Sequence, residues 1–208
     1  MNKQEPIKFM IALKKQEKTE IIITGFGGQG IVLAGRILGE AAALGDKKES
    51  TLIQSYGPES RGGACSAQVI ISNQSIHYPY INSPDILVCM SHSGYEKYIG
   101  HIKKEGVLLY DQDLVHPEKN TCDMFSIPAT RMAEELGRKM MANIIMLGFF
   151  TTITRAISVS AAKETVINTV PKGTEENNII AFTKGADYGM ATLKGREKKA
   201  AGKTGTIS

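Results

Sequence analysis

Short apolar runs and longer amphipathic stretches follow one another along the first part of the chain. Six runs have the length and composition of β-strands, and they lie at residues 20–24, 51–54, 64–72, 85–90, 107–110 and 124–127. Two stretches between them, 28–44 and 94–102, carry apolar residues at helical spacing. Strands that alternate with helices in this way predict an α/β domain built around a layered sheet.

One further strand is predicted from a turn. Asn73 and Gln74 follow the run at 64–72, and a short strand around 76–80 is expected to pair back on that run. The run at 85–90 is apolar at nearly every position, which is typical of a strand covered on both faces. We therefore expect a β-hairpin inserted into an otherwise Rossmann-like first half.

The last third of the chain has helical patterns. Apolar spacing predicts helices over residues 129–138, 140–155, 161–170 and 177–190. Ser158 is suited to cap the third of these helices, and Pro171 ends it. The predicted fold class is therefore α/β, with a Rossmann-like layered sheet, an inserted β-hairpin and a helix-rich C-terminal part.

Both ends of the chain are basic and carry +4 and +3, so the middle carries about −3 within the net charge of +4. Residues 191–208 hold five basic side chains and one acid, and residues 1–18 hold five lysines and two acids. Such segments are typical of solvated, disordered termini, although a basic tail can also bind nucleic acid or a membrane surface. We expect a flexible leader at 1–18, a single domain at 19–193 and a disordered tail at 194–208, with no nucleic-acid or membrane partner.

The cysteines and the longest apolar stretch bear on cellular location. Cys65, Cys89 and Cys122 lack the CxxC spacing of cluster or zinc sites, so we expect core residues and no metal site. The longest apolar stretch, 140–153, is too short to span a bilayer. The N-terminus shows no signal-peptide pattern, and a cytoplasmic protein with reduced thiols is expected.

The residues after the first predicted strand offer candidate chemistry. Gly25-Phe26-Gly27-Gly28-Gln29-Gly30 join this strand to a helix, an arrangement that directs backbone N–H groups at an anionic ligand. An NAD site of this kind also needs an acid at the end of the second strand. Residues 51–54 run instead into Ser55-Tyr56-Gly57-Pro58, so an ordinary NAD site is not expected. Plain strand–helix packing is the alternative interpretation of the glycines.

A second glycine-rich loop, residues 55–63, leaves the end of the second predicted strand. Ligands in open α/β sheets bind at the carboxyl ends of strands, so this loop should lie beside the glycine turn and form one rim with it. Arg61 is the side chain there that is suited to a bidentate grip on phosphate or carboxylate. A salt bridge to Glu59 or to a partner subunit is the alternative role for Arg61.

Groups that could carry out catalysis by themselves are not evident. The sequence shows no Ser–His–Asp arrangement and no paired acids. Asp111 and Asp113 flank Gln112 in a pattern that an Asx turn explains, and His92 is expected on the surface or at a helix cap. We therefore assign no catalytic residue and favour a subunit or a binding module over a self-sufficient enzyme.

Three motifs, in this order, resemble those of a known family. The glycine turn at 25–30, Ser-Tyr-Gly-Pro-Glu-Ser-Arg-Gly-Gly at 55–63 and Pro-Asp-Ile-Leu-Val at 84–88 are similar to the gamma subunit of 2-oxoacid:ferredoxin oxidoreductases. The stretches 128–137 and 142–148 also match, and the resemblance covers about residues 20–190. The 55–63 loop looks most like the 2-oxoglutarate type, with pyruvate-, branched-chain 2-oxoacid- and indolepyruvate-type complexes as alternatives.

This resemblance implies an oxidoreductase subunit that is not active alone. The family's holoenzyme decarboxylates a 2-oxoacid, transfers the acyl group to coenzyme A and passes electrons to ferredoxin. Thiamine diphosphate, Mg²⁺ and iron–sulfur clusters belong to alpha, beta and ferredoxin-like (delta) partner subunits, so none is expected on this chain alone. The expected coenzyme A contacts are Gly27, Gly28, Gly30, Ser55, Gly57, Arg61, Gly62 and Gly63.

Two other interpretations stay open at this point. A free-standing NAD(P)-dependent dehydrogenase would need a carboxylate or a basic pocket after the second strand, together with a catalytic Tyr–Lys or His set. A purely structural subunit would use both glycine loops for packing and for contacts to the alpha and beta chains.

Overall fold

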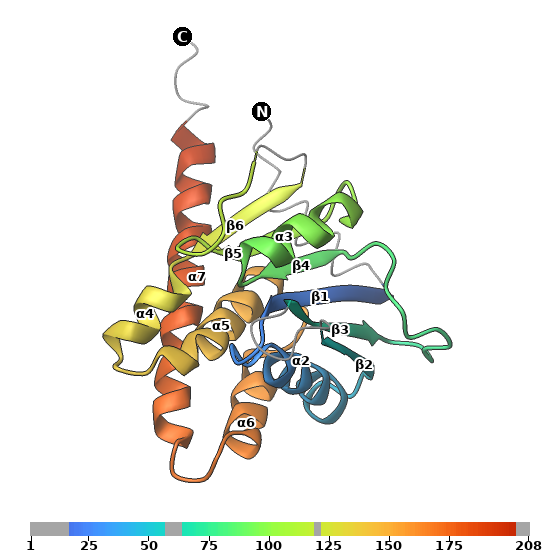
Figure 1. Ribbon diagram of the computed structural model, residues 1–208, viewed down its shortest axis with the longest axis horizontal. Helices are drawn as coiled ribbons and strands as arrows, with labels where there is room; N and C mark the ends of the chain where they lie inside the picture. Colours follow the sequence, from blue (N-terminus) through green and yellow to red (C-terminus); the bar gives the residue numbers. More distant parts are fainter. Residues whose placement is uncertain (1–16, 57–63, 119–121, 203–208) are drawn as a thin grey trace.

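The computed structural model describes residues 17–56, 64–118 and 122–202. Within these residues, a six-stranded sheet has the order β2-β3-β1-β4-β5-β6, and helices cover both of its faces (Figure 1). The strands are β1 (Lys18–Phe26), β2 (Glu49–Tyr56), β3 (Ala64–Ser72), β4 (Ile86–Cys89), β5 (Val107–Asp111) and β6 (Asp123–Ile127). The predicted α/β class is confirmed.

The hairpin in the first half is made by β2 and β3, which pair in antiparallel fashion. Strand β3 also pairs with β1, again antiparallel, whereas β1, β4, β5 and β6 run parallel to one another. The prediction of a strand at 76–80 that pairs with β3 is wrong. Strand β3 already pairs with β2 on one edge and with β1 on the other, so no edge is left for a further strand. That segment follows an irregular path, on which the N–H of Ile81 donates to Oε1 of Gln68 at 3.1 Å.

The helices divide unequally between the two faces of the sheet. They are α2 (Ile31–Glu40), α3 (His92–Tyr98), α4 (Ala129–Glu135), α5 (Ala142–Thr154), α6 (Val159–Thr169) and α7 (Glu175–Gly202). The larger apolar cluster joins one face of the sheet to α2 and to α4 through α7, and the smaller cluster joins the other face to α3. The predicted first helix ends in a π-helical turn, Ala41–Gly45, and Ser158 caps α6 as expected by accepting from the N–H of Ala161.

Helix α5 is buried along its whole length, which agrees with its almost wholly apolar sequence. Two glycines let it approach α7 closely. A Cβ atom at Gly148 would lie less than 3.0 Å from the carbonyl oxygen of Phe182, and one at Gly185 would lie equally close to that of Ile145. The two helices therefore touch backbone to backbone, and this contact determines where α5 lies.

Helix α7 continues beyond the end predicted at residue 190. Arg196 donates to Oδ1 of Asp123 at 2.6 Å and to the carbonyl oxygen of Met124, and its guanidinium lies 3.6 Å from the ring centroid of Phe125. These partners lie on β6, which is an edge strand of the sheet that the structure describes. The structure continues α7 to Gly202, whereas the sequence led us to expect a disordered tail from residue 194, because local composition does not reveal this distant partner.

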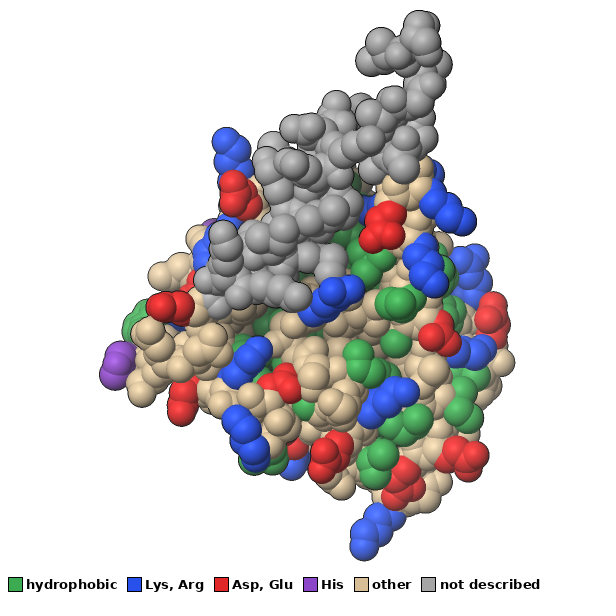
Figure 2. Space-filling view, turned by 180° about the vertical axis from the view of Figure 1, so that it is seen from behind, with side chains coloured by type: hydrophobic (Ala, Val, Ile, Leu, Met, Phe, Trp, Pro, Cys, Tyr) green, Lys and Arg blue, Asp and Glu red, His purple; other side chains and the backbone are tan. Residues whose placement is uncertain are grey.

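The predicted leader at 1–18 and the last residues of the predicted tail lie almost entirely outside the described residues, apart from Glu17 and Lys18, at which β1 begins. On the described part of the face shown in Figure 2, Lys and Arg side chains are interspersed with Asp and Glu, as on an ordinary solvated surface. None of the described helices has both the length and the hydrophobicity needed to cross a membrane.

A small cluster of ion pairs lies at the amino ends of β1 and β4. Nζ of Lys103 lies 2.9 Å from Oε2 of Glu20 and 2.9 Å from Oδ1 of Asp85, and the N–H of Glu20 donates to the second Asp85 oxygen at 2.8 Å. Burial by itself would raise the pKa of Glu20, but hydrogen bonds from Lys18 and Lys103 outweigh it and hold that pKa below its ordinary value. These bonds join the amino ends of β1 and β4.

Candidate functional site

The glycine turn between β1 and α2 has a backbone path that requires glycine at two positions. Gly28 has φ 93° and Gly30 has φ 73°, values that strain any residue with a Cβ atom. The N–H of Gln29 donates to the carbonyl of Phe26 at 3.2 Å, which closes the turn. The turn thus forms as expected at the carboxyl end of β1.

The side chain of Gln29 braces this turn from within. Its Oε1 accepts from the N–H of Phe26 at 2.6 Å, and its Nε2 donates to the carbonyl of Met90 at 3.0 Å. Met90 follows the end of β4, so Gln29 couples the turn to the neighbouring strand. The sequence alone did not single out this residue, because its second partner is far away in the chain.

Asn143 supports the turn from the other side. Its Nδ2 donates to the carbonyl of Gly30 at 3.1 Å, and its Oδ1 accepts from the N–H of Ile144 at 2.9 Å. A Cβ atom at Gly30 would collide with the Asn143 amide, so glycine is required there by packing as well as by φ. The buried helix α5 therefore meets the start of α2 at this point.

The outer lip of the turn is open. Gly27 is exposed, does not have a left-handed φ, and would place a Cβ atom with no neighbour within 4 Å. Phe26 beside it is 39% exposed. Nothing in the described chain requires glycine at 27, so this position has room for a group from outside the chain to approach the backbone.

The electrostatic character of the lip comes from helix α2. This helix has neither a side-chain cap nor an acid in its first turn, and its first internal bond runs from the N–H of Ala34 to the carbonyl of Gly30. The preceding N–H groups have no acceptor within the helix and carry a partial positive charge. The turn can therefore bind an anionic oxygen through backbone donors.

The pairing of the strands places the second loop at the same edge of the sheet. Gly25 pairs with Cys65, which pairs with Tyr56, and Thr24, Ser66 and Ser55 form the next row. The carboxyl ends of β1 and β2 therefore share one edge, about 10 Å apart, with β3 between them. Ser55 lies there and is exposed.

Half of the predicted contact set is thus placed at this edge, namely Gly27, Gly28, Gly30 and Ser55. Gly57, Arg61, Gly62 and Gly63 lie outside the described residues, as does Glu59. The contacts themselves remain a prediction.

The same pairing argues against a dinucleotide site of the Rossmann type. In that fold the strand beside β1 is parallel to it and ends in the acid that holds the ribose. Here the neighbour on that side is β3, which runs antiparallel, and β2 ends at Tyr56. The missing acid in the sequence and the strand order are two separate reasons to reject the NAD interpretation.

Asp111 is the fully buried carboxylate at this edge of the sheet. It accepts from the N–H and Oγ1 of Thr130, at 2.8 and 2.6 Å, and from the N–H of Asp113 at 3.1 Å. Burial raises its pKa above the ordinary value in spite of these bonds. The Asx turn expected here is confirmed, and Asp111 also anchors the start of α4.

The cysteines and His92 have the structural roles that were expected. Cys65, Cys89 and Cys122 are buried and unpaired, and burial raises the pKa of each thiol. His92 begins α3, stacks on Tyr95 at 5.6 Å between ring centroids and remains part-exposed.

Comparison with known proteins agrees with this geometry. Residues 20–188 match the family described as pyruvate ferredoxin/flavodoxin oxidoreductase. The chain belongs to this family.

Relatives within the family resemble the chain over most of their length. The 2-oxoglutarate synthase subunit KorC of Methanocaldococcus jannaschii is 50% identical, over 81% of this chain and 92% of the relative. That of Methanothermobacter marburgensis is 47% identical, over 85% of this chain and all of the relative. The resemblance to a gamma subunit of a 2-oxoacid:ferredoxin oxidoreductase is thereby confirmed.

Two solved structures of the oxidoreductase family share the fold. The gamma subunit of a keto/oxoacid ferredoxin oxidoreductase from Geobacter sulfurreducens is 36% identical, with a TM-score of 0.75 over 83% of this chain and 99% of that one. The 2-oxoglutarate:ferredoxin oxidoreductase of Magnetococcus marinus, described with 2-oxoglutarate, coenzyme A and succinyl-CoA bound, is 23% identical with a TM-score of 0.76. The chain covers 32% of that longer protein, and the likeness to it concerns the fold.

Proposed function

We propose that this chain is the gamma subunit of a 2-oxoglutarate:ferredoxin oxidoreductase, which converts 2-oxoglutarate and coenzyme A into succinyl-CoA and passes electrons to ferredoxin. The observation that carries the proposal is the identity of 45–50% to three subunits named 2-oxoglutarate synthase KorC. Relatives named for ketoisovalerate or pyruvate are 28–31% identical. The 2-oxoglutarate type is therefore favoured over the other 2-oxoacid types.

The reactive cofactors are assigned to partner subunits. Thiamine diphosphate with Mg²⁺ and the iron–sulfur clusters would belong to alpha, beta and ferredoxin-like delta chains, and ferredoxin would accept the electrons. This chain would contribute binding and orientation, the role that proteins have in cofactor chemistry generally. A cytoplasmic location is proposed with the complex, in keeping with three unpaired thiols.

Within this complex, the glycine turn and the 55–63 loop are proposed to seat coenzyme A. Backbone N–H groups at Gly27, Gly28 and the start of α2 would meet its phosphates, and Arg61 would add a charged, bidentate contact. The exposed ring of Phe26 offers a flat apolar surface on which an adenine can stack. The open position at Gly27 is the observation that supports this part of the proposal.

The substrate is tested with the assembled complex. Ferredoxin reduction should require both coenzyme A and a 2-oxoacid, and kcat/KM should be highest for 2-oxoglutarate among 2-oxoglutarate, pyruvate, 2-oxoisovalerate and indolepyruvate. A complex that prefers pyruvate would refute the assignment of the substrate but would leave the family role intact. Turnover of nicotinamide by this chain alone would refute both.

The coenzyme A contact is tested with two variants and a matched control. Gly27→Ala should raise the KM for coenzyme A more than tenfold by blocking the approach to the backbone, and Arg61→Ala should raise it by tenfold or more through loss of a charge-assisted bond. Gly100→Ala is the control, because a Cβ atom there also meets nothing within 4 Å and lies away from the turn. Unchanged KM values in both test variants would favour the purely structural subunit.

A further inference from the structure

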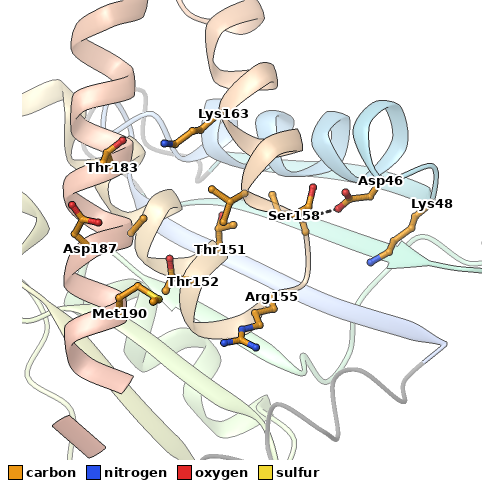
Figure 3. A pocket seen from close by; sticks show the side chains of 13 residues that line it. Asp46, Lys48, Thr151, Thr152, Arg155, Ser158, Lys163, Thr183, Asp187 and Met190 are labelled. Carbon is orange, nitrogen blue, oxygen red and sulfur yellow. Dashed lines mark hydrogen bonds between the residues drawn. The ribbon is translucent and has the colours of Figure 1, made fainter. Parts of the chain in front are cut away.

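We infer that the chain has a second binding site, for a small organic anion with a short apolar segment. The site is a cavity of about 710 Å³ between α5, α6, α7 and the segment that precedes β2 (Figure 3). That volume lies within the range of natural small-molecule pockets. Apolar walls and free polar groups meet in it.

This cavity is far from the glycine turn. Lys48, in its wall, directly precedes Glu49, which pairs with Ser72, and Ser72 pairs with Lys18 at the amino end of β1. The turn lies beyond the other end of β1, roughly 23 Å away at the usual rise of a strand. The cavity is therefore separate from the coenzyme A site proposed above.

A hydroxyl without a partner among the described residues lies in the wall of the cavity. Thr152 is 7% exposed and lines the cavity, yet its hydroxyl makes no hydrogen bond to any residue that the structure describes. By contrast, Thr151 and Thr154 on the same helix donate to carbonyl oxygens one turn back, at 2.8 and 2.9 Å. The Thr152 hydroxyl is therefore available to hydrogen-bond a molecule that enters the cavity.

Two cations in the cavity wall also have no ion-pair partner among the described residues. Arg155 ends α5 with φ 54°, a left-handed conformation that favours glycine or asparagine at this place. It lines the cavity, as does half-buried Lys163, and neither makes an ion pair within the described part of the chain. An arginine in an unfavourable backbone conformation and a second unpaired cation, both in the wall of one cavity, are suited to an anionic ligand.

Two of the other charged residues in the wall, Lys48 and Asp46, make hydrogen bonds within the chain. Nζ of Lys48 donates to the carbonyl of Ala156 at 3.0 Å, and Asp46 accepts from the N–H of Ser158 at 2.7 Å. These bonds hold the chain between α5 and α6 in place, as Figure 3 shows for Asp46 and Ser158. Asp187 is the acid in the wall that makes no such bond among the described residues, so the free charges sum to one positive charge.

The rest of the lining sets the shape of the ligand. Val159 and Met190 are 44% and 47% exposed, and both lie in the wall of the cavity. A group of two charges and a hydroxyl beside such apolar surface fits a carboxylate or a phosphate monoester that carries a short alkyl segment. Both anions use the same donors, so the experiment has to distinguish them.

Binding is measured first with the assembled complex. Saturation-transfer NMR with hexyl phosphate and with hexanoate should show binding of at least one, and hexanol, which keeps the alkyl chain without the anion, should bind at least tenfold more weakly. Comparison of the two anions shows whether phosphate or carboxylate is preferred. The absence of saturation transfer for both anions, or equal affinity for hexanol, would overturn the proposal.

Variants locate the site. Arg155→Gly removes the charge at a position where glycine fits the backbone, and Lys163→Gln removes the second cation, so each should raise the Kd about tenfold with the fold retained. Lys184→Gln is the control, because this exposed lysine lies on α7 outside the wall. Equal effects of all three variants would overturn the proposal. So would binding to the full chain that disappears in the complex, because a partner subunit would then fill the cavity.

Discussion

Substituting Gly148 by alanine would place one methyl group between the backbones of α5 and α7. The new Cβ atom would lie less than 3.0 Å from the carbonyl oxygen of Phe182 and 2.9 Å from its carbonyl carbon. Backbone atoms cannot rotate away as a side chain can, so the two helices would have to separate. Because α5 carries Asn143 at one end and Arg155 at the other, such a shift would reach both proposed sites.

The expected cost follows from two opposing effects. Overpacking a well-packed core typically costs ~1–3 kcal/mol, and a clash with backbone atoms belongs at the upper end of that range. Alanine is favoured over glycine inside a helix by about 1 kcal/mol, which offsets part of the cost. We expect Gly148→Ala to lower the free energy of unfolding by about 2 kcal/mol and the Tm by roughly 4–8 °C for a chain of this size.

Thermal and urea unfolding of the full chain, followed by circular dichroism, would measure this change. Gly195→Ala is the matched control, since it lies inside α7 where a Cβ atom meets nothing within 4 Å. That control should gain about 1 kcal/mol from helix propensity alone, so the two variants should move in opposite directions. A Gly148→Ala chain as stable as the wild type would refute the close contact between the helices.

Four further predictions concern other parts of the chain. Gln29→Ala should lower the free energy of unfolding by ~1–2 kcal/mol through loss of two hydrogen bonds and raise the KM for coenzyme A, and an unchanged KM would separate this residue from the coenzyme A site. Burial raises the pKa of Asp111, so its contribution to stability is present below the ordinary Asp pKa of about 4 and is lost as pH rises through the pKa in the folded state. The free energy of unfolding, measured with urea across this range, should therefore fall less with rising pH in Asp111→Asn than in the wild type. The pKa of Glu20 is lowered, so its contribution to stability is present above the ordinary Glu pKa and is lost as pH falls through the pKa in the folded state. Glu20→Gln should therefore reduce the loss of unfolding free energy at low pH. Arg196→Met should speed hydrogen exchange at the end of α7 and cost about 1–2 kcal/mol, whereas unchanged exchange would mean that the pair with Asp123 does not hold the helix.

Local patterns were enough to identify most of the elements and the family. A run that is apolar at nearly every position predicted β4 as a strand covered on both faces, and other short apolar runs predicted β1, β5 and β6. Glycines and a serine cap marked where α2 and α6 begin, since such signals act within a few residues. The glycine turn, and the absence of an acid after β2, could be read in the same way.

Tertiary structure alone decided how these elements meet. The place of β3 between β1 and β2 depends on which strand edges are free, and the prediction of a strand at 76–80 failed for that reason. Residues 194–202 are helical because Arg196 finds partners on β6, more than 70 positions earlier in the chain. No local window contains both members of such a contact.

The residues that shape the two proposed sites are also far apart in the chain. Asn143 supports Gly30 across 113 positions, and the cavity wall joins Lys48 to Arg155 and Lys163 on other elements. The amino-acid sequence by itself determined the strands, the helices, the glycine turn and the family to which they belong. The folded chain decided that α5 runs from the turn to a cavity at the far end of the sheet, because only packing brings residues so distant in the chain into contact.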